Sequence, residues 1–204
     1  MLKLRSFLNS NPEKEELTLP GVMDGAGVVF TRARAIRAAS RLKPSLIKYA
    51  LRAKNGRPLC RVAGSLRRRA PHVHDIDIVA CVSRTPDDLM VPETNPRAKL
   101  RTEIKAKAGE IISWGPDHAR FLFENIPVDL YFTKPSRFAL ALLVATGSSC
   151  HLRKLNLRAK SRNLHLQPGQ HVLSTEDYAE IEVASEEDVY SKLGVPYQSP
   201  QQRA

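Results

Sequence analysis

Residues 59–82 read LCRVAGSLRRRAPHVHDIDIVACV, and this stretch decides the fold class of the chain. The apolar run 59–63 and the mostly β-branched run 76–82 each predict a short strand. The turn Gly64-Ser65 and three arginines lie between these runs, and Asp75-Ile76-Asp77 opens the second strand. A glycine turn therefore leads from one strand into another that begins with two acidic side chains.

On the amino-terminal side, residues 31–51 have the composition of a helix that Thr31 can cap. Pro44 lies inside this span, so one helix and two helices are both compatible with the sequence. Residues 1–30 are a polar lead-in with loop signals at Asn11-Pro12 and at three glycines. Four apolar residues fall on one face of the predicted helix: Ala35, Ile36, Ala39 and Leu42.

On the carboxy-terminal side, residues 86–96 predict a loop and residues 97–110 a charged, exposed helix. Strand pieces follow at 111–114 and 120–123, and Glu124-Asn125 turns into a third piece at 127–133, which predicts a hairpin. Residues 135–162 read as two helices that are split at 146–148, and short elements lead to a final loop at 196–203. Strands and helices that neither alternate strictly nor separate predict an α+β fold around a core sheet, with a boundary near residue 135.

The basic residues of the chain are concentrated in a few stretches and are not spread evenly. The net charge is +11, and residues 31–72 contain thirteen Lys and Arg but no Asp or Glu. Residues 130–175 are a second acid-free stretch, and acids then crowd between Glu176 and Asp188. Such stretches create a positive field that attracts phosphate backbones, although a solvated basic face without a partner remains the alternative.

Asp75 and Asp77 are two residues apart on a predicted strand, so they project from the same face. Two buried carboxylates this close repel each other, and a hard divalent cation such as Mg²⁺ removes that penalty. Asp129 lies on another short apolar strand, as a third ligand would. An isolated Asp-x-Asp pair is more often a solvated strand edge, and the preceding phosphate-binding turn is what favours a metal site.

Gly64-Ser65 has the properties of a phosphate-binding turn. Glycine lets the backbone approach a phosphate, and the serine hydroxyl and following N–H groups can donate to its oxygens. Arg67, Arg68 and Arg69 then supply cations near a leaving pyrophosphate. A glycine-serine turn and a triple arginine are each common alone, and their combination with the acidic strand is much rarer.

Other features of the sequence are less informative. Cys60, Cys81 and Cys150 have no paired spacing for zinc and an odd count, so we expect reduced thiols in an intracellular protein of the cytoplasm or nucleoid. No apolar run approaches the roughly 20 residues that a membrane span needs, and the start lacks a signal peptide. Loop histidines His72 and His74 lack further ligands for a metal. Trp114, Phe121 and Phe123 are predicted to pack in the core.

The motif Gly64-Ser65-x-Arg67-Arg68, followed by Asp75-x-Asp77 and Asp129, resembles the nucleotidyltransferase superfamily. Thr146-Gly147-Ser148 follows Asp129 at the interval seen in family X DNA polymerases, the group that includes polymerase β. The ending at 187–203 is also similar to the carboxy terminus of that family. The resemblance covers residues 31–203 and is specific to family X in its second half.

The resemblance implies a palm with a mixed sheet and a small α/β thumb-like subdomain. The expected parts are an amino-terminal extension at 1–30, a catalytic palm at 31–135 and a carboxy-terminal nucleotide-binding subdomain at 136–204. Asp75 and Asp77 would bind both of two Mg²⁺ ions, for which Mn²⁺ is an alternative. Asp129 would bind the catalytic ion and help to activate the primer 3′-hydroxyl.

The resemblance also assigns residues to the nucleotide. Gly64, Ser65, Arg68 and the backbone N–H of His74 would bind the β and γ phosphates. Thr146, Gly147 and Ser148 would form the hinge of the nucleotide-binding subdomain, at a peptide bond that the family often holds cis.

The chain departs from the family in two respects. The amino-terminal lyase domain has no counterpart in residues 1–30, so we expect a minimal form similar to those of some viruses. Val144-Ala145 replaces the Tyr-Phe pair that opposes the ribose 2′-hydroxyl in polymerase β, and Leu152 replaces an Asn that reads the minor-groove edge.

The leading hypothesis is a monomeric, template-directed DNA polymerase that uses nucleoside triphosphates on primer-template or gapped DNA, in repair. One alternative is template-independent transfer of a nucleotide to RNA, DNA or a small molecule. The other is a nucleic-acid-binding protein with an inactive site.

Overall fold

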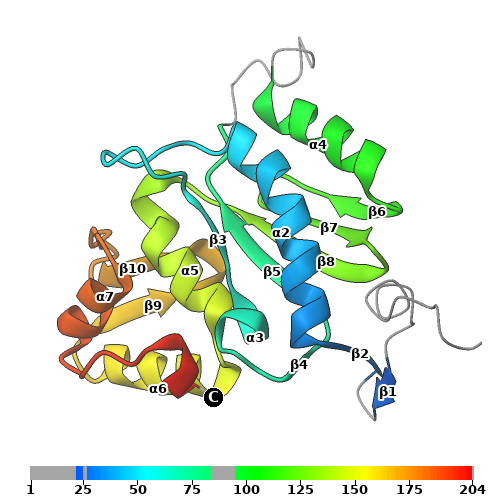
Figure 1. Ribbon diagram of the computed structural model, residues 1–204. Coiled ribbons are helices and arrows are strands. Elements are labelled where there is room, and N and C mark those ends of the chain that lie inside the picture. Colours follow the sequence, from blue (N-terminus) through cyan, green and yellow to red (C-terminus); the bar gives the residue numbers. More distant parts are fainter. Residues whose placement is uncertain (1–21, 25–26, 84–94, 204) are drawn as a thin grey trace, which may run out of the picture.

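The computed structural model describes residues 22–24, 27–83 and 95–203, which form mixed helical and strand structure (Figure 1). The central sheet has the order β3-β5-β8-β7-β6. Strands β5 and β8 are parallel and the other pairs are antiparallel, so the sheet is mixed, in agreement with the expected fold class. Its strands have these bounds: β3 Cys60–Val62, β5 Ile76–Ala80, β6 Glu110–Trp114, β7 His118–Phe123 and β8 Ile126–Phe132.

Two helices, α2 (Arg32–Tyr49) and α4 (Pro96–Lys107), cover one face of this sheet (Figure 1). Thr31 caps α2, because its side chain accepts a hydrogen bond from the backbone N–H of Arg34 at 3.3 Å. Pro44 does not interrupt the helix, so the single-helix alternative is the correct one.

The apolar face of α2 is largely as predicted. Ala35, Ala39 and Leu42 are buried in the core. Ile36 is the exception, since it is 38% exposed and lies beside an open groove that the sequence did not reveal. Trp114 packs against the core and Phe121 and Phe123 are buried in it, which confirms that prediction.

The hairpin between β7 and β8 is confirmed. Glu124 and Asn125 have φ angles of 52° and 61°, as a two-residue type I′ turn requires. The turn sets the register, and counting back from Phe123↔Ile126 pairs Arg120 with Asp129.

The part from residue 135 onward is built on two helices, α5 (Phe138–Thr146) and α6 (Ser149–Lys160), split where the sequence predicts. It has its own hydrophobic cluster, and α5 joins it to the sheet through Ala141 and Leu142, which pack on Val79 of β5. The division at residues 30 and 135 stays a prediction. The remaining elements are η2 Pro135–Arg137, β9 Leu164–Gln167, η3 Pro168–Gln170, β10 Val172–Thr175, α7 Glu186–Leu193 and η4 Pro200–Arg203.

The prediction of a loop for residues 1–30 is wrong at its carboxy-terminal end. Strands β1 (Val22–Asp24) and β2 (Gly27–Thr31) form a three-stranded sheet with β4 (His72–Val73). The run Val28-Val29-Phe30 favours a strand, and the nearby glycines obscured it. The loop signals at Asn11-Pro12, Gly21 and Gly25 and most of the loop expected at 86–96 lie outside the described residues.

Candidate active site

The two carboxylates Asp77 and Asp129 lie side by side on parallel strands. They are Cα partners in the register of β5 and β8, and Asp75 immediately precedes β5. The neighbours Ile76 and Ile78 belong to the core under α2, so Asp77 projects from the opposite face of the sheet. Strand register therefore brings Asp77 and Asp129 together, and strand alternation directs Asp77 away from the core under α2.

The glycine turn packs directly against this acidic strand. Residues Gly64–Arg67 form the short helix α3, and Gly64 has a φ of +60°. A Cβ added at Gly64 would lie 1.8 Å from Asp77 Oδ2. The backbone N–H of Ala63 also donates to the carbonyl of Asp77 at 2.8 Å. Glycine is therefore required here both by its conformation and by the close approach of a carboxylate.

A cavity of about 500 Å³ unites most of the predicted site residues. Asp129 does not line it, and Val144, Ala145 and Leu152 form part of its apolar wall. The geometry is compatible with the roles expected for these residues, which stay predictions. The predicted site residues that line the cavity are Gly64, Ser65, Arg68, His74, Asp75, Asp77, Thr146, Gly147 and Ser148.

Asp129 has partners that the sequence analysis missed. It is 4% exposed, its Oδ1 accepts a hydrogen bond from His118 Nε2 at 2.8 Å, and its Oδ2 lies 3.5 Å from Arg120 Nη1. Both partners come from β7, the strand next to β8. The predicted hairpin contained this information, because its register brings Arg120 opposite Asp129.

The acidic cluster carries negative charge that is only partly balanced. Burial raises the pKa of Asp77 to about 7, and the charges of Asp75 and Asp129 act in the same direction. Burial, followed by the charge of Asp129, also raises the pKa of Asp75. Tyr131 donates a long hydrogen bond of 3.4 Å to Asp77 Oδ1, which opposes the shift only in part.

A divalent cation would relieve this repulsion, and carboxylate oxygens are the ligands that Mg²⁺ prefers. Among the residues that the structure describes, however, no three His, Cys, Asp or Glu side chains are grouped so as to hold a metal ion. Asp129 is turned toward His118 and Arg120 instead. The chemistry of the donor set thus fits the cation, and the metal site stays a prediction.

The hinge region has the expected conformation. The peptide bond between Gly147 and Ser148 is cis, as the resemblance implies. Ser148 caps α6 by accepting a hydrogen bond from the backbone N–H of His151 at 3.3 Å. Its own N–H donates to the carbonyl of Arg203 at 3.1 Å, so the end of η4 is tied to the hinge.

The three arginines after the glycine turn do not act together, which corrects the expectation that all would supply cations to a pyrophosphate. Arg68 lines the cavity and donates to the carbonyl of Thr146. Arg67 points away, donates to Thr146 Oγ1 at 2.7 Å and pairs with Glu186 of α7. Arg69 lines a different cavity. The direction of each side chain is set by the single turn of α3, which the sequence alone does not give.

Glu186 is the centre of a buried ion pair network that the sequence analysis also missed. Arg203, which is 0% exposed, donates to Glu186 Oε1 at 2.8 Å. Burial opposes the charged form of Glu186, but hydrogen bonds from Arg67 and Arg203 outweigh it and lower the pKa of Glu186. The network links α3, α7 and η4, and no local pattern in the sequence identifies partners this far apart.

Comparison with known families gives one match. Residues 141–204 match the family model described as DNA polymerase beta thumb. No curated protein matches the chain. The match supports a polymerase β-like, family X relationship and implies DNA binding. It begins within α5 and covers the hinge, Glu186, Arg203 and η4, but neither Arg67 nor the acidic cluster.

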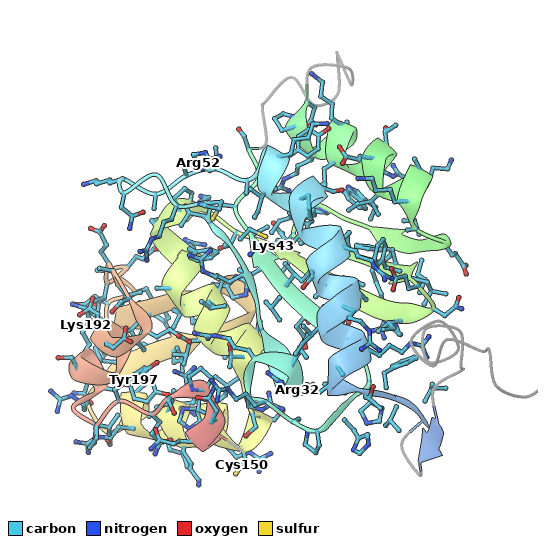
Figure 2. The ribbon with its side chains drawn as sticks, in the orientation of Figure 1. Arg32, Lys43, Arg52, Cys150, Lys192 and Tyr197 are labelled. Atoms are coloured by element: carbon cyan, nitrogen blue, oxygen red, sulfur yellow. The ribbon has the colours of Figure 1, made fainter. Side chains whose placement is uncertain are left out.

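In the described part of the chain, no helix is long and apolar enough to cross a membrane. Cys60 and Cys81 are buried thiols, and Cys150 is exposed at the start of α6 (Figure 2).

Proposed function

We propose that this protein is a template-directed DNA polymerase of the family X type, which adds nucleotides to a DNA 3′ end during gap filling or repair. The observation that carries the proposal is the cavity that brings the glycine-serine turn, Asp75, Asp77 and the cis hinge together. A phosphate-binding turn beside two carboxylates suits a nucleoside triphosphate with a divalent cation. The thumb match on the other side of the cavity supports a polynucleotide substrate.

Three residues would hold the two Mg²⁺ ions: Asp75, Asp77 and Asp129. Bound there, the ions would stabilise charge on the phosphoryl oxygens and lower the pKa of the attacking 3′-hydroxyl. The raised pKa values of Asp75 and Asp77 support this assignment, because burial and then the neighbouring carboxylates disfavour their charged forms, and a bound cation would offset both effects.

The triphosphate would be oriented by Ser65 and Arg68, with the backbone N–H of His74. Arg68 uses one N–H group on the carbonyl of Thr146, and a guanidinium has five donors, so others remain for a phosphate. Arg67 has a positioning role in this scheme. Its pairing with Glu186 fixes α3 against α7 and so holds Ser65 and Arg68 in place.

A primer-extension assay tests the proposal. Hairpin substrates that carry each template base in turn are incubated with each nucleotide alone, with and without Mg²⁺ or Mn²⁺. Incorporation that follows the template base and requires the metal is the expected result. Incorporation that is indifferent to the template would instead indicate template-independent transfer. No incorporation under any condition would indicate a nucleic-acid-binding protein with an inactive site.

A further inference from the structure

A second cavity, a groove of about 750 Å³, lies between α2 and the edge strand β3. Its apolar lining includes Ile36 and Leu46 of α2 and Ile78 of β5. Since Ile78 projects to the α2 side of the sheet and Asp77 to the other side, the groove is separate from the acidic site. The helix α3 divides the two, because Leu66 faces the groove and Ser65 faces the acidic cavity.

The groove is strongly cationic. No Asp or Glu is found among its described lining residues. Figure 2 shows two of the cations, Arg32 near the start of α2 and Lys43 farther along, on the side of the helix toward β3. The cations that line the groove are Arg32, Lys43, Arg57, Arg61, Arg67 and Arg69.

The cations on the two sides of α2 have different surroundings. On the side of α2 away from the groove, Arg41 pairs with Glu124 at 2.9 Å and Lys48 with Glu103 at 3.0 Å. Of the groove cations, Arg67 alone pairs with a carboxylate among the described residues, and it does so on the far side of α3. The cations around α2 are therefore not one uniformly solvated face, because six of them line one groove and, among the described residues, only Arg67 of these six pairs with a carboxylate.

Two groove residues differ in how their guanidinium groups are held. Arg32 Nε is buried and has no hydrogen-bond partner within the described structure. Arg61 donates to the carbonyls of Pro58 and Cys60 at 3.0 and 2.8 Å, which fixes its guanidinium along the edge of β3. A ligand that brings anionic oxygens into the groove would therefore meet, at Arg61, a guanidinium that is already ordered.

We propose that this groove binds a single strand of nucleic acid. Cations along the rim suit the phosphates, and the exposed side chain of Ile36 offers an apolar surface to unpaired bases, which a duplex keeps stacked inside. Arg32 and Lys43 are eleven residues apart on α2, a rise of about 16 Å, so they can contact different phosphates of one strand. The volume is that of a pocket for a small ligand, so it admits one strand and not a duplex.

The test compares two double variants that change the net charge equally. Lys43→Glu with Arg57→Glu alters the groove, and Arg101→Glu with Lys105→Glu alters exposed positions on α4, the other helix on the same face of the sheet. A labelled single-stranded oligonucleotide of about ten bases is titrated at several salt concentrations in EDTA, with fluorescence polarisation as the readout. EDTA prevents turnover, so the titration does not depend on the proposed polymerase activity.

Loss of two phosphate contacts should make the negative slope of log affinity against log salt shallower by about 1.4, since each contact contributes about −0.7 on a single strand. Affinity at moderate salt should fall roughly tenfold. The α4 variant should keep the wild-type slope. Circular dichroism checks folding, and Lys43→Gln with Arg57→Gln provides a milder second variant with the same expected direction.

Three results would overturn the inference. Equal slopes for the groove and α4 variants would mean that the cations act only through net charge. Displacement of the strand by inorganic triphosphate at the affinity of the strand itself would indicate a site for small polyphosphates. Equal losses of single-stranded and duplex affinity in the groove variant would show that the groove does not select a single strand.

Discussion

Asp77 and Asp129 are the same residue type, one strand apart and in register, yet their surroundings differ. On one side, β7 places His118 and Arg120 against Asp129. On the other, among the described residues, the carboxylate of Asp77 accepts only a long hydrogen bond from Tyr131, and Gly64 packs against it. Strand register determines where two carboxylates lie, and the adjacent strand determines whether their charge is balanced.

The largest effect on activity should come from removing Asp129, the carboxylate whose charge is balanced by its neighbours. Asp129→Ala would lower the rate of nucleotide incorporation by on the order of a thousandfold or more, because the proposed ligand of the catalytic ion would be lost. Triphosphate affinity should survive better, since Asp75 and Asp77 remain. Single-turnover incorporation and equilibrium nucleotide binding measure the two quantities.

Asp117→Ala is the matched control for this variant, because Asp117 is exposed in the turn before β7. It should retain wild-type incorporation. An Asp129→Ala protein that extends a primer at a near wild-type rate would refute the assigned role.

A smaller effect is expected from the residues that hold Asp129. His118→Ala should raise the Mg²⁺ concentration for half-maximal activity by roughly 10- to 100-fold, because a partner that would orient the proposed metal ligand Asp129 is lost. His118→Gln retains an N–H donor and should recover part of the loss. A Mg²⁺ titration at saturating triphosphate separates this effect from a change in KM.

Arg120→Ala should shift the same Mg²⁺ midpoint less, because its contact with Asp129 is longer and more exposed. Unchanged midpoints in both variants would mean that β7 has no influence on the metal site. The comparison of the two aspartates would then have no functional meaning.

The smallest effect should be on the free energy of unfolding, and its pH dependence reports on Asp77. Burial raises the pKa of Asp77 from 3.8 to about 7, so the folded state keeps a proton that the unfolded state has released. The resulting stabilisation is present below pH 4 and is lost as the pH rises through about 7. Without metal, the free energy of unfolding should fall by roughly 1–2 kcal/mol more between pH 5 and 8 than it does in Asp77→Asn.

Urea unfolding in EDTA measures this difference, and Asp117→Asn serves as a control that should follow the wild type. Addition of Mg²⁺ at pH 8 should restore stability to the wild type and not to Asp77→Asn. Parallel pH profiles for wild type and Asp77→Asn would show that Asp77 is ionised without penalty.

The sequence predicted the local features of the site well. The turn at Gly64-Ser65 and the alternation of Asp75 with Asp77 are properties of neighbouring residues, and short-range rules describe them. The hairpin at Glu124-Asn125 was equally local. It also fixed the pairing of Arg120 with Asp129, which counting along the two strands would have revealed.

Features that depend on distant residues could not be predicted in the same way. The pairing of Arg67 with Glu186 joins residues 119 positions apart. It depends on the turn of α3 and on the docking of α7, neither of which a periodic pattern encodes. The sorting of cations around α2 has the same origin, because carboxylates from α4 and the β7–β8 turn select their partners only in the folded protein.

The contact between Gly64 and Asp77 has a consequence for how this chain can evolve. Every amino acid replacement at position 64 adds at least a Cβ, and that atom would lie where the Asp77 carboxylate lies. In a saturation library selected for activity, position 64 should therefore accept no substitution, whereas the exposed Gly56, with a similar φ and open space around it, should accept at least Asn. A lineage that altered position 64 would have to change the acidic strand at the same time. No single amino acid substitution at this position should therefore be tolerated.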